Sequence, residues 1–337
     1  MKIALDAMGG DLAPSSPLDG ARDALDAYSW IDKLYLVGDE DILKKETDAR
    51  GLPAGKIEIV HAEQVIEMTD PAIAALRKKK NSSITKAVDL VKTGDCQAVV
   101  SAGHTGAAVA ASTVRLRNLP GVERAGIASP MPNEHGACNI IDAGANLEAK
   151  PFHLLQYAVM GSVYAKYVFR RENPIIGLMS VGEEDEKGTE FTKEVFALLK
   201  DSGLNFRGNV EGHDLFSTPL DVVVCDGFVG NVVLKSCEAT AKIVFKWVKD
   251  EIGQAGPIAK LGALMAKPAF KAVHKRGSYE SYGGSPLLGV DGITIIGHGS
   301  SSPVAIQNAI RVAGEAIRHQ VNPHITEEIQ KFAPSNA

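Results

Sequence analysis

Short apolar runs that end in glycine-rich turns recur along the chain, and a segment with helical spacing follows each of them. The pattern occurs six times, in the stretches that begin "KIALDAMGGD", "AVVSAGHTGAA", "NIIDAGAN", "PIIGLMSVGEEDEKGTE", "DVVVCDGFVG" and "GITIIGHGSSSP". A run such as "DVVVC" is apolar at successive positions, which is typical of strands covered by helices on both faces. The alternation predicts a three-layer α/β/α fold with a mostly parallel sheet.

The length of 337 residues is enough for one large α/β domain. We predict a catalytic α/β domain over residues 1–320, built either as one unit or as two lobes around a central cleft. An irregular helical excursion is expected at about 251–290, which is rich in Gly, Lys and Pro. Residues 321–337 are expected to form a C-terminal tail.

Composition and charge limit the classes of partner and the cellular compartment that the sequence favours. The formal net charge of -5 disfavours nucleic acid, because binding to the phosphate backbone needs a surplus of Lys and Arg. The start "MKIALDAMGGD" is typical of a strand and a glycine turn, not of a signal peptide. No apolar run approaches the roughly 20 residues that span a bilayer. The four cysteines are far apart, which favours a reduced, cytoplasmic protein.

The glycine turns predict an anion site. Each lies at the carboxyl end of a strand, where glycine lets the backbone approach a ligand and the next helix presents unpaired N–H groups. Several such turns around one crevice would form a substrate cleft. None matches a phosphate loop or a dinucleotide fingerprint, which disfavours nucleotide hydrolysis and hydride transfer. The predicted substrate-binding residues are Gly9, Gly10, Ser101, Gly103, His104, Thr105, Gly106, Asn146, Gly230, His298 and Ser300.

At this point the motifs resemble those of a known family. "DAMGGD", "SAGHTGA", "DAGAN", "GEEDEKG", "VVCDGFVGNVVLK", "YGGSPLLGVDG" and "GHGSS" follow one another as in the bacterial phosphate acyltransferases of phospholipid synthesis, over about residues 1–320. The resemblance implies a fold like that of isocitrate and isopropylmalate dehydrogenases, a homodimer, and acyl phosphate formation from acyl-acyl carrier protein and inorganic phosphate. It also implies a product used by a membrane glycerol-3-phosphate acyltransferase.

One position departs from the family pattern. His104 stands where Asn is expected in many relatives, and Asn cannot do the acid–base work of histidine. We therefore expect His104 to donate a hydrogen bond or to be a spectator. Asp6, Asp142 and Asp226 stand near strand ends and could suggest a magnesium cluster, but such acids also hold turns by accepting backbone N–H bonds. Since the family needs no metal, we predict neither a metal nor a cofactor.

Lys187 is the predicted catalytic cation. The turn "SVGEEDEKGTE" surrounds it with five acids and precedes a helix that Thr189 can cap. Beside free N–H groups, Lys187 could hold phosphate and stabilise an anionic transition state, while the acids orient it, keep it charged or hold the turn. Asn231 is its predicted partner, with an amide that could donate to phosphate or to a thioester oxyanion. The alternatives are a solvated acidic loop and an Asn231 N-cap.

The predicted chemistry is direct attack of phosphate on the thioester carbonyl. The competing route through an acyl-cysteine would need a stabilised thiolate, and Cys225 follows a buried-looking strand without an obvious neighbouring base. A short-chain transacylase acting between coenzyme A and phosphate is a near alternative. A dehydrogenase of the same fold and a non-enzymatic carrier-binding or membrane scaffold are more distant ones.

Two surfaces are predicted to meet partners. Acyl carrier proteins are acidic, and the densest basic run is Arg77, Lys78, Lys79 and Lys80; its alternative role is a helix C-terminus favoured by the macrodipole. Residues 257–275 fit an amphipathic basic helix that could lie on an anionic membrane. The alternative is packing on the protein itself or on a dimer mate, with Pro268 as a bend. The predicted membrane contacts are Leu261, Met265, Lys267 and Lys271.

Overall fold

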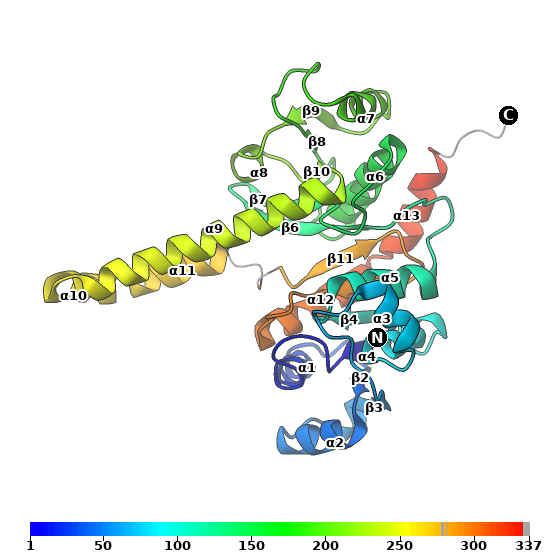
Figure 1. Cartoon of the computed structure of the whole chain (residues 1–337), viewed down its shortest axis with the longest axis vertical. Helices are drawn as coiled ribbons and strands as arrows, with labels where there is room; N and C mark the ends of the chain where they lie inside the picture. Colours follow the sequence, from blue (N-terminus) through cyan, green and yellow to red (C-terminus); the bar gives the residue numbers. More distant parts are fainter. Residues whose placement is uncertain (278–279, 281, 333–337) are drawn as a thin grey trace.

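The computed structural model describes residues 1–277, 280 and 282–332. Within these residues the strands form two sheets, each at the centre of its own lobe (Figure 1). The predicted α/β class with mostly parallel strands is confirmed, although the strands divide between two sheets. The chain leaves the first sheet after residue 127 and returns to it at residue 285, so the first lobe contains both early and late segments.

The sheet of the first lobe has the strand order β3-β2-β1-β4-β12-β11-β5. Its first five strands in this order pair in parallel, and β11 pairs antiparallel with both of its neighbours. The strands are β1 (Lys2–Asp6), β2 (Lys33–Gly38), β3 (Ile57–His61), β4 (Ala98–Ser101), β5 (Gly126–Ile127), β11 (Ser285–Leu288) and β12 (Ile293–Ile296).

Helices cover both faces of this sheet. In β1, Ile3 and Leu5 belong to the apolar core shared with α1 and α12, whereas Ala4 belongs to the core shared with α4 and α5. Successive side chains of a strand point to opposite faces, so this strand supplies both cores. The helices of the lobe are α1 (Ser15–Ala27), α2 (Glu40–Ala49), α3 (Ala72–Lys78), α4 (Ser83–Lys92), α5 (Thr105–Leu116) and α12 (Pro303–Arg318), with a 3₁₀ turn at Ala54–Lys56.

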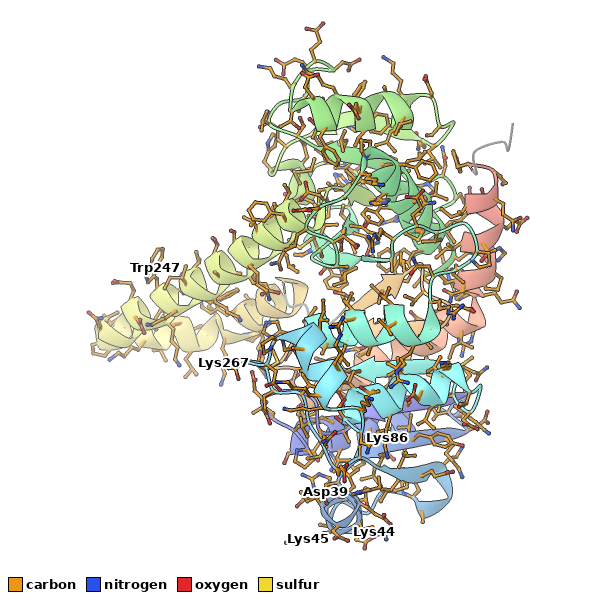
Figure 2. All side chains as sticks on the ribbon, turned by 45° about the vertical axis from the view of Figure 1, so that its right-hand side comes forward. Asp39, Lys44, Lys45, Lys86, Trp247 and Lys267 are labelled. Carbon is orange, nitrogen blue, oxygen red and sulfur yellow. The ribbon has the colours of Figure 1, made fainter. Side chains whose placement is uncertain are left out.

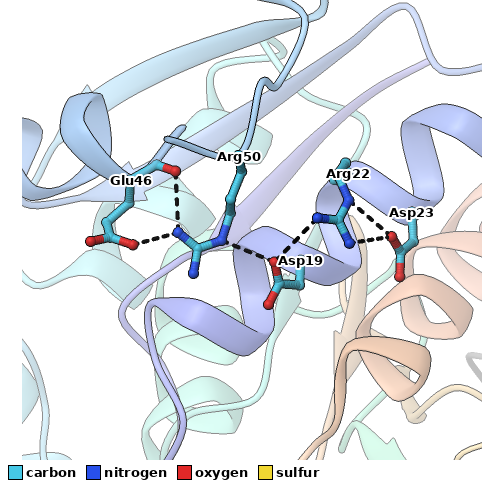
Figure 3. Close-up of polar contacts among 5 residues, drawn as sticks. All are labelled: Asp19, Arg22, Asp23, Glu46 and Arg50. Atoms are coloured by element: carbon cyan, nitrogen blue, oxygen red, sulfur yellow. Dashed lines mark hydrogen bonds and ion pairs between the residues drawn. The ribbon is translucent and has the colours of Figure 1, made fainter. Parts of the chain in front are cut away.

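A chain of ion pairs joins α2 to α1 (Figure 3). Arg50, which follows α2, donates from Nε to Asp19 of α1 at 3.0 Å and also pairs with Glu46. Arg22 lies 2.9 Å from Asp23 and 3.7 Å from Asp19. Exposed pairs of this kind contribute at most about 1 kcal/mol each. The network therefore fixes the position of α2 more than it stabilises the lobe.

The sheet of the second lobe has the strand order β6-β7-β10-β8-β9, and β6 is antiparallel to an otherwise parallel set. The apolar run "DVVVC" is buried as predicted, since Val222, Val223 and Val224 are fully buried. The strands are β6 (Ser129–Asn133), β7 (Gly136–Ile141), β8 (Ile176–Met179), β9 (Phe206–Val210) and β10 (Val222–Val224). The helices around them are α6 (Pro151–Tyr167), α7 (Glu190–Lys200) and α8 (Asp214–Ser217).

The segment after residue 320 differs from the expected tail. Val321–Gln330 forms α13, which packs on α6. Its Val321, Ile325 and Ile329 are buried in the apolar core of the second lobe. These positions recur every four residues, so they line one face of a helix and bury it. Residues 333–337 of the predicted tail lie outside the described part of the chain.

The predicted excursion is more regular than expected. α9 (Gly227–Gln254) leaves the second lobe as a long helix, and α10 (Pro257–Met265) and α11 (Lys267–Gly277) complete an arm that projects from the body (Figure 1). The segment expected to form one helix over 257–275 is broken between Met265 and Lys267. Pro257 and Pro268 stand in the first turns of α10 and α11, where proline is tolerated, so they start helices rather than disrupt them.

All six predicted strand–turn–helix units are present, from β1–α1 to β12–α12. In the first sheet β1, β4 and β12 are neighbours, and in the second sheet β7, β10 and β8 are neighbours. Parallel neighbours have their carboxyl ends at the same edge of a sheet. Each lobe therefore gathers three of the predicted turns at one edge.

Candidate active site

The first two turns of the first lobe contact each other around Asp6. The Ser101 hydroxyl donates to the Asp6 carboxylate at 2.7 Å and accepts from the backbone N–H of Gly103 at 3.1 Å. A Cβ at Gly9 would lie 2.5 Å from that carboxylate, so only glycine fits there. Burial raises the pKa of Asp6. Ser101 therefore binds the two turns together, and its hydroxyl is already engaged on both sides.

The third turn of this lobe closes over the first. A Cβ at Gly10 would lie 2.9 Å from the carbonyl oxygen of Gly299, and Gly10 has φ of +106°. In the same turn, His298 Nδ1 lies 2.9 Å from the Ser300 hydroxyl and accepts from the Ser300 N–H at 3.2 Å. Nδ1 thus carries no proton, and Nε2 is the protonated nitrogen. Burial lowers the pKa of His298, which favours the neutral ring at pH 7.

His104 caps α5, as a hydrogen-bonding residue is expected to do. Its Nδ1 accepts from the N–H of Ala107 at 3.3 Å, and its Nε2 lies 3.0 Å from the carbonyl oxygen of Asp70, to which it donates. The prediction that His104 is a donor rather than a base fits these bonds. An asparagine side chain could accept at the same cap position. Thr105 and Gly106 follow in the first turn of α5.

In the second lobe Asp142 organises the turn after β7. Its carboxylate is fully buried and accepts from the backbone N–H groups of Ile127, Gly144, Ala145 and Asn146 at 2.7–3.0 Å. Burial raises the pKa of Asp142, while the N–H bonds oppose that shift by favouring the carboxylate. The turn-holding alternative for the strand-end acids is therefore correct here, since all these contacts are to backbone.

Asn146 and Gly230 support the same turn. The Asn146 amide donates to the carbonyl oxygen of Ala125 at 2.6 Å and to the Tyr157 hydroxyl at 2.8 Å. Both bonds are internal, so the amide nitrogen of this predicted substrate ligand braces the turn. Gly230 packs so closely that a Cβ would lie 1.9 Å from the carbonyl oxygen of Asp142. Its role is to let α9 approach the turn.

Asn231 stands beyond the cap of α9. The N-cap is Asp226, whose carboxylate accepts from the N–H of Val229 at 2.8 Å. The alternative reading of Asn231 as an N-cap is therefore wrong. Its side chain is exposed and faces Gly144, whose added Cβ would lie 3.4 Å from Asn231 Cβ. The amide is thus presented beside the Asp142 turn.

A cavity of about 850 Å³ joins the turn edges of the two lobes. The first lobe contributes Thr105, Gly297 and His298 to its wall, and the second contributes Ala143 and Asn231. Its volume lies in the range of small-molecule sites. The structure therefore brings together Asn231, His298 and Thr105 from the predicted set, with the N-terminal turns of α5 and α9 at the same place.

Lys187 lies outside the wall of this cavity as described, on the turn between β8 and α7. Its side chain is exposed, and among the described residues it forms no ion pair. Asp185 pairs with Lys200 and Glu190 pairs with Lys193, while the carbonyl oxygen of Glu184 accepts from the Lys187 N–H at 3.0 Å. Two of the acids therefore pair with lysines of α7 rather than with Lys187. Thr189 caps α7 as predicted, by accepting from the N–H of Thr192.

One group near this turn has metal-ligand chemistry. Glu183, His213 and Asp214 each place a ligand atom within 4.8 Å of the others. The Asp214 carboxylate is already used, because it accepts from the N–H of Glu211 at 2.8 Å and from the Thr218 hydroxyl. These bonds assign Asp214 to its own turn, and we derive no catalytic step from the group.

The cavity also contains residues that sequence reasoning missed. Lys235 and Glu238 line it and pair with each other at 2.9 Å, and Glu238 lies 3.9 Å from His298 Nε2. They follow Asn231 by four and seven residues, which places all three on one face of α9. That spacing was visible in the sequence, but the face of α9 that meets the cavity was not.

Known proteins match the chain over almost its whole length. A family described as "Fatty acid synthesis protein" matches residues 1–324. The phosphate acyltransferase of Akkermansia muciniphila is 56% identical over 98% of this chain and 97% of its own length. The phosphate acyltransferase of Pelotomaculum thermopropionicum is 49% identical over 100% of this chain and 97% of its own.

Solved structures agree on the fold. A phosphotransacetylase from Streptococcus pyogenes superimposes with a TM-score of 0.61 at 18% identity, covering 94% of each chain. The EutD phosphotransacetylase from Staphylococcus aureus gives a TM-score of 0.57 at 15% identity, covering 94% of this chain and 93% of its own. The chain, with its strand-end turns gathered around one cavity, belongs to the phosphate acyltransferase family of fatty acid and phospholipid synthesis.

Proposed function

We propose that the chain makes acyl phosphate from a long-chain acyl-acyl carrier protein and inorganic phosphate. The observation that carries this proposal is the cavity in which turns of both sheets meet Asn231 and the first turns of α5 and α9. Helix N-termini attract an anion, and an amide donor beside them suits an oxyanion. The cavity also continues into apolar walls, which suit an acyl chain better than a charged nucleotide.

The reaction we propose is a direct transfer. A phosphate oxygen attacks the thioester carbonyl carbon and forms a tetrahedral oxyanion, which collapses by breaking the C–S bond and releasing the carrier's thiolate. Phosphate is already nucleophilic at neutral pH, so the site has to hold it in line and offset the developing charge. Lys187 would hold phosphate, and the Asn231 amide would donate to phosphate or to the oxyanion. The product would pass to a membrane glycerol-3-phosphate acyltransferase.

The cysteines support direct transfer over an acyl-cysteine route. Cys225, which follows β10, is buried, and its thiol faces the carbonyl oxygen of Asp142 at 3.7 Å. Cys237 lines the cavity and is partly exposed, and partial burial together with the neighbouring Glu238 raises the pKa of its thiol. Burial raises the pKa of Cys225 well above the ordinary value, and burial raises the pKa of Cys96 to about 12. A thiol in such surroundings is a poor nucleophile at neutral pH.

Trapping of the product tests the function. The purified chain is incubated with palmitoyl-acyl carrier protein and phosphate, and acyl phosphate is converted to a hydroxamate with hydroxylamine. We expect hydroxamate only when both phosphate and the chain are present. Reactions without phosphate measure direct attack of hydroxylamine on the thioester. Parallel reactions with palmitoyl- and acetyl-coenzyme A separate the leading proposal from a short-chain transacylase, and loss of phosphate dependence would refute both.

For the acyl carrier protein we propose a dock on α3. Arg77 and Lys78 are exposed in its last turn and line a shallow hollow with the exposed Ile73. Lys79, which the sequence placed in the same dock, is otherwise engaged: its Nζ donates to the carbonyl oxygen of Val65 at 2.7 Å and to Asp70 at 2.6 Å. Since His104 also bonds to Asp70, this basic patch lies close to the cap of α5 and thus to the cavity.

Charge reversal tests this dock. The double variant Arg77→Glu/Lys78→Glu is expected to raise KM for the acylated carrier by about tenfold at low salt, because an acidic partner loses its electrostatic steering. The effect should shrink as salt is raised. Lys45→Glu is the matched control, since this exposed lysine of α2 lies at the far end of the first lobe (Figure 2). Equal KM values for the double variant and the control would exclude the dock.

For the arm we propose contact with an anionic membrane through α10. Ile258 is 88% exposed, Met265 77% and Leu261 60%. All three belong to α10, which lies at the far end of the arm (Figure 1). Lys267 and Lys271 follow in α11. A helix with exposed apolar and basic residues suits an anionic interface. Among the described residues, no helix combines the length and apolar character required to cross a bilayer.

The exposed face of α9 around Trp247 would serve the homodimer (Figure 2).

Sedimentation with liposomes tests the membrane contact. Leu261→Glu is expected to reduce binding to vesicles with anionic lipid by at least fivefold, since a charge in the apolar face opposes insertion. Val114→Glu is the control, because Val114 is at least as exposed as Leu261 but lies on α5 in the body. Light scattering of both variants separates lost membrane binding from lost dimer. Equal binding by Leu261→Glu and Val114→Glu would count against the proposal.

A further inference from the structure

One face of α9 forms a continuous wall of the cavity. Beyond Asn231, the apolar residues Leu234, Cys237, Ala241 and Phe245 line it at helical spacing. From Asn231 to Phe245 the helix rises by about 21 Å. This stripe therefore leads from the predicted catalytic amide outward along the arm, over a distance comparable with an extended long-chain acyl group.

The opposite wall of the cavity is also apolar. It is made by Pro130, Met131 and Pro132 of β6 and by Phe216 of α8. Met131 is buried, and Leu234 and Cys237 of α9 pack against the apolar cluster to which it belongs.

Lys235, Glu238 and Lys242 are the charged residues that α9 contributes to the cavity, and Glu280 also lines it. Lys235 and Glu238 pair there, and Glu238 lies next to His298. Leu234 and Cys237, which pack against the cluster of Met131, form the apolar side of α9 next to β6.

We propose that this apolar part of the cavity is the acyl-chain channel, and that Ala241 and its neighbours on α9 set the preferred chain length. The proposal rests on the proposed function, because it takes Asn231 as the place of the thioester carbonyl. An acyl chain fits better than a peptide or a second copy of this chain, because an apolar stripe of α9 leads away from Asn231 and β6 adds apolar side chains to the same cavity. A chain that leaves the carbonyl at Asn231 would follow the stripe from Leu234 to Phe245.

A bulky side chain at Ala241 tests the channel. Ala241 is exposed and lines the cavity, so Ala241→Trp places a bulky ring in it. The ratio of kcat/KM for palmitoyl- to butyryl-acyl carrier protein is expected to fall at least tenfold, because only the long chain reaches residue 241. Ala239→Trp is the matched control. Ala239 is an exposed alanine of the same helix, two residues away and therefore on another face, outside the described lining of the cavity.

Cys237 offers a second readout that needs no turnover. Cys96, Cys138 and Cys225 are buried, whereas Cys237 is partly exposed in the channel. Without phosphate, palmitoyl-acyl carrier protein is expected to slow alkylation of Cys237 by N-ethylmaleimide at least fivefold, and butyryl-acyl carrier protein less than twofold. Cys237→Ser gives the background.

The two readouts separate this proposal from the proposed function. Alkylation reports occupancy of the channel even if no acyl phosphate forms, so failure of the reaction and failure of the channel are distinguishable. An Ala241→Trp variant with the same palmitoyl-to-butyryl ratio as Ala239→Trp would overturn the assignment. So would equal protection of Cys237 by the two acylated carriers.

Discussion

Lys187→Ala is expected to lower kcat by about 10²-fold or more while the fold stays intact, which is the usual scale for losing one donor to a transition state. Lys187 is the residue of the acidic turn whose ammonium is uncommitted among the described residues, since Lys193 and Lys200 pair with neighbouring acids. Its flexible four-carbon stem leaves the ammonium free to move relative to the turn. Phosphate-dependent release of the free carrier measures kcat, and circular dichroism checks the fold.

The matched control is Lys193→Ala, which removes an equally charged side chain from the first turn of the same helix, α7. Its kcat should stay within about twofold of the wild type, as expected for an exposed pair. The comparison separates a specific role of Lys187 from a general loss of positive charge around the turn. A folded Lys187→Ala protein with near-normal turnover would return the turn to the solvated acidic surface that was its alternative.

Asn231→Ala is expected to lower kcat by a similar factor of about 10², because it removes the amide donor at the meeting point of the two lobes. In this structure the substitution removes the amide without removing the cap of α9. Asp226, not Asn231, caps α9, and alanine has a higher helix propensity than asparagine. The thermal midpoint should therefore stay the same or rise, so that lost activity reflects the lost amide.

Two control variants accompany Asn231→Ala, one for activity and one for stability. Val232→Ala shortens the exposed neighbouring side chain outside the described cavity lining and should leave kcat unchanged. Asp226→Ala should instead lower the thermal midpoint, because it removes the cap at a cost of about 1 kcal/mol. Wild-type turnover in Asn231→Ala would show that the amide contacts neither phosphate nor the oxyanion.

Local features of the chain were predictable because local forces decide them. The apolar runs specified buried strands, and the turn chemistry specified where helices begin; Thr189 caps α7 as expected. The choice between a magnesium cluster and turn-holding acids was also decided locally. Asp142 and Asp226 accept hydrogen bonds from backbone N–H groups close to them in the chain. The motifs that resemble the family are of the same kind, since each is a turn with its own hydrogen bonds.

Errors arose where a helix depends on distant partners. The segment Val321–Gln330 looked like a tail, yet α13 is held by burial against α6, more than 150 residues earlier in the chain. Pro257 and Pro268 suggested irregular structure, but each stands in a first helical turn, where its effect reverses. The bonds of Asn146 to Ala125 and Tyr157 were likewise not predicted, and its contact with substrate stays a prediction.

By itself, then, the sequence determined the α/β class, the strand–turn–helix units and the polar residues at their tips, since backbone periodicity and capping act within about ten residues. Only the tertiary structure decided that the strands divide into two sheets and that the turns after β4, β12, β7 and β10 share one cavity. It also decided which stripe of α9 faces β6 and which faces His298. These choices depend on packing between segments far apart in the chain, and no local pattern carries that information.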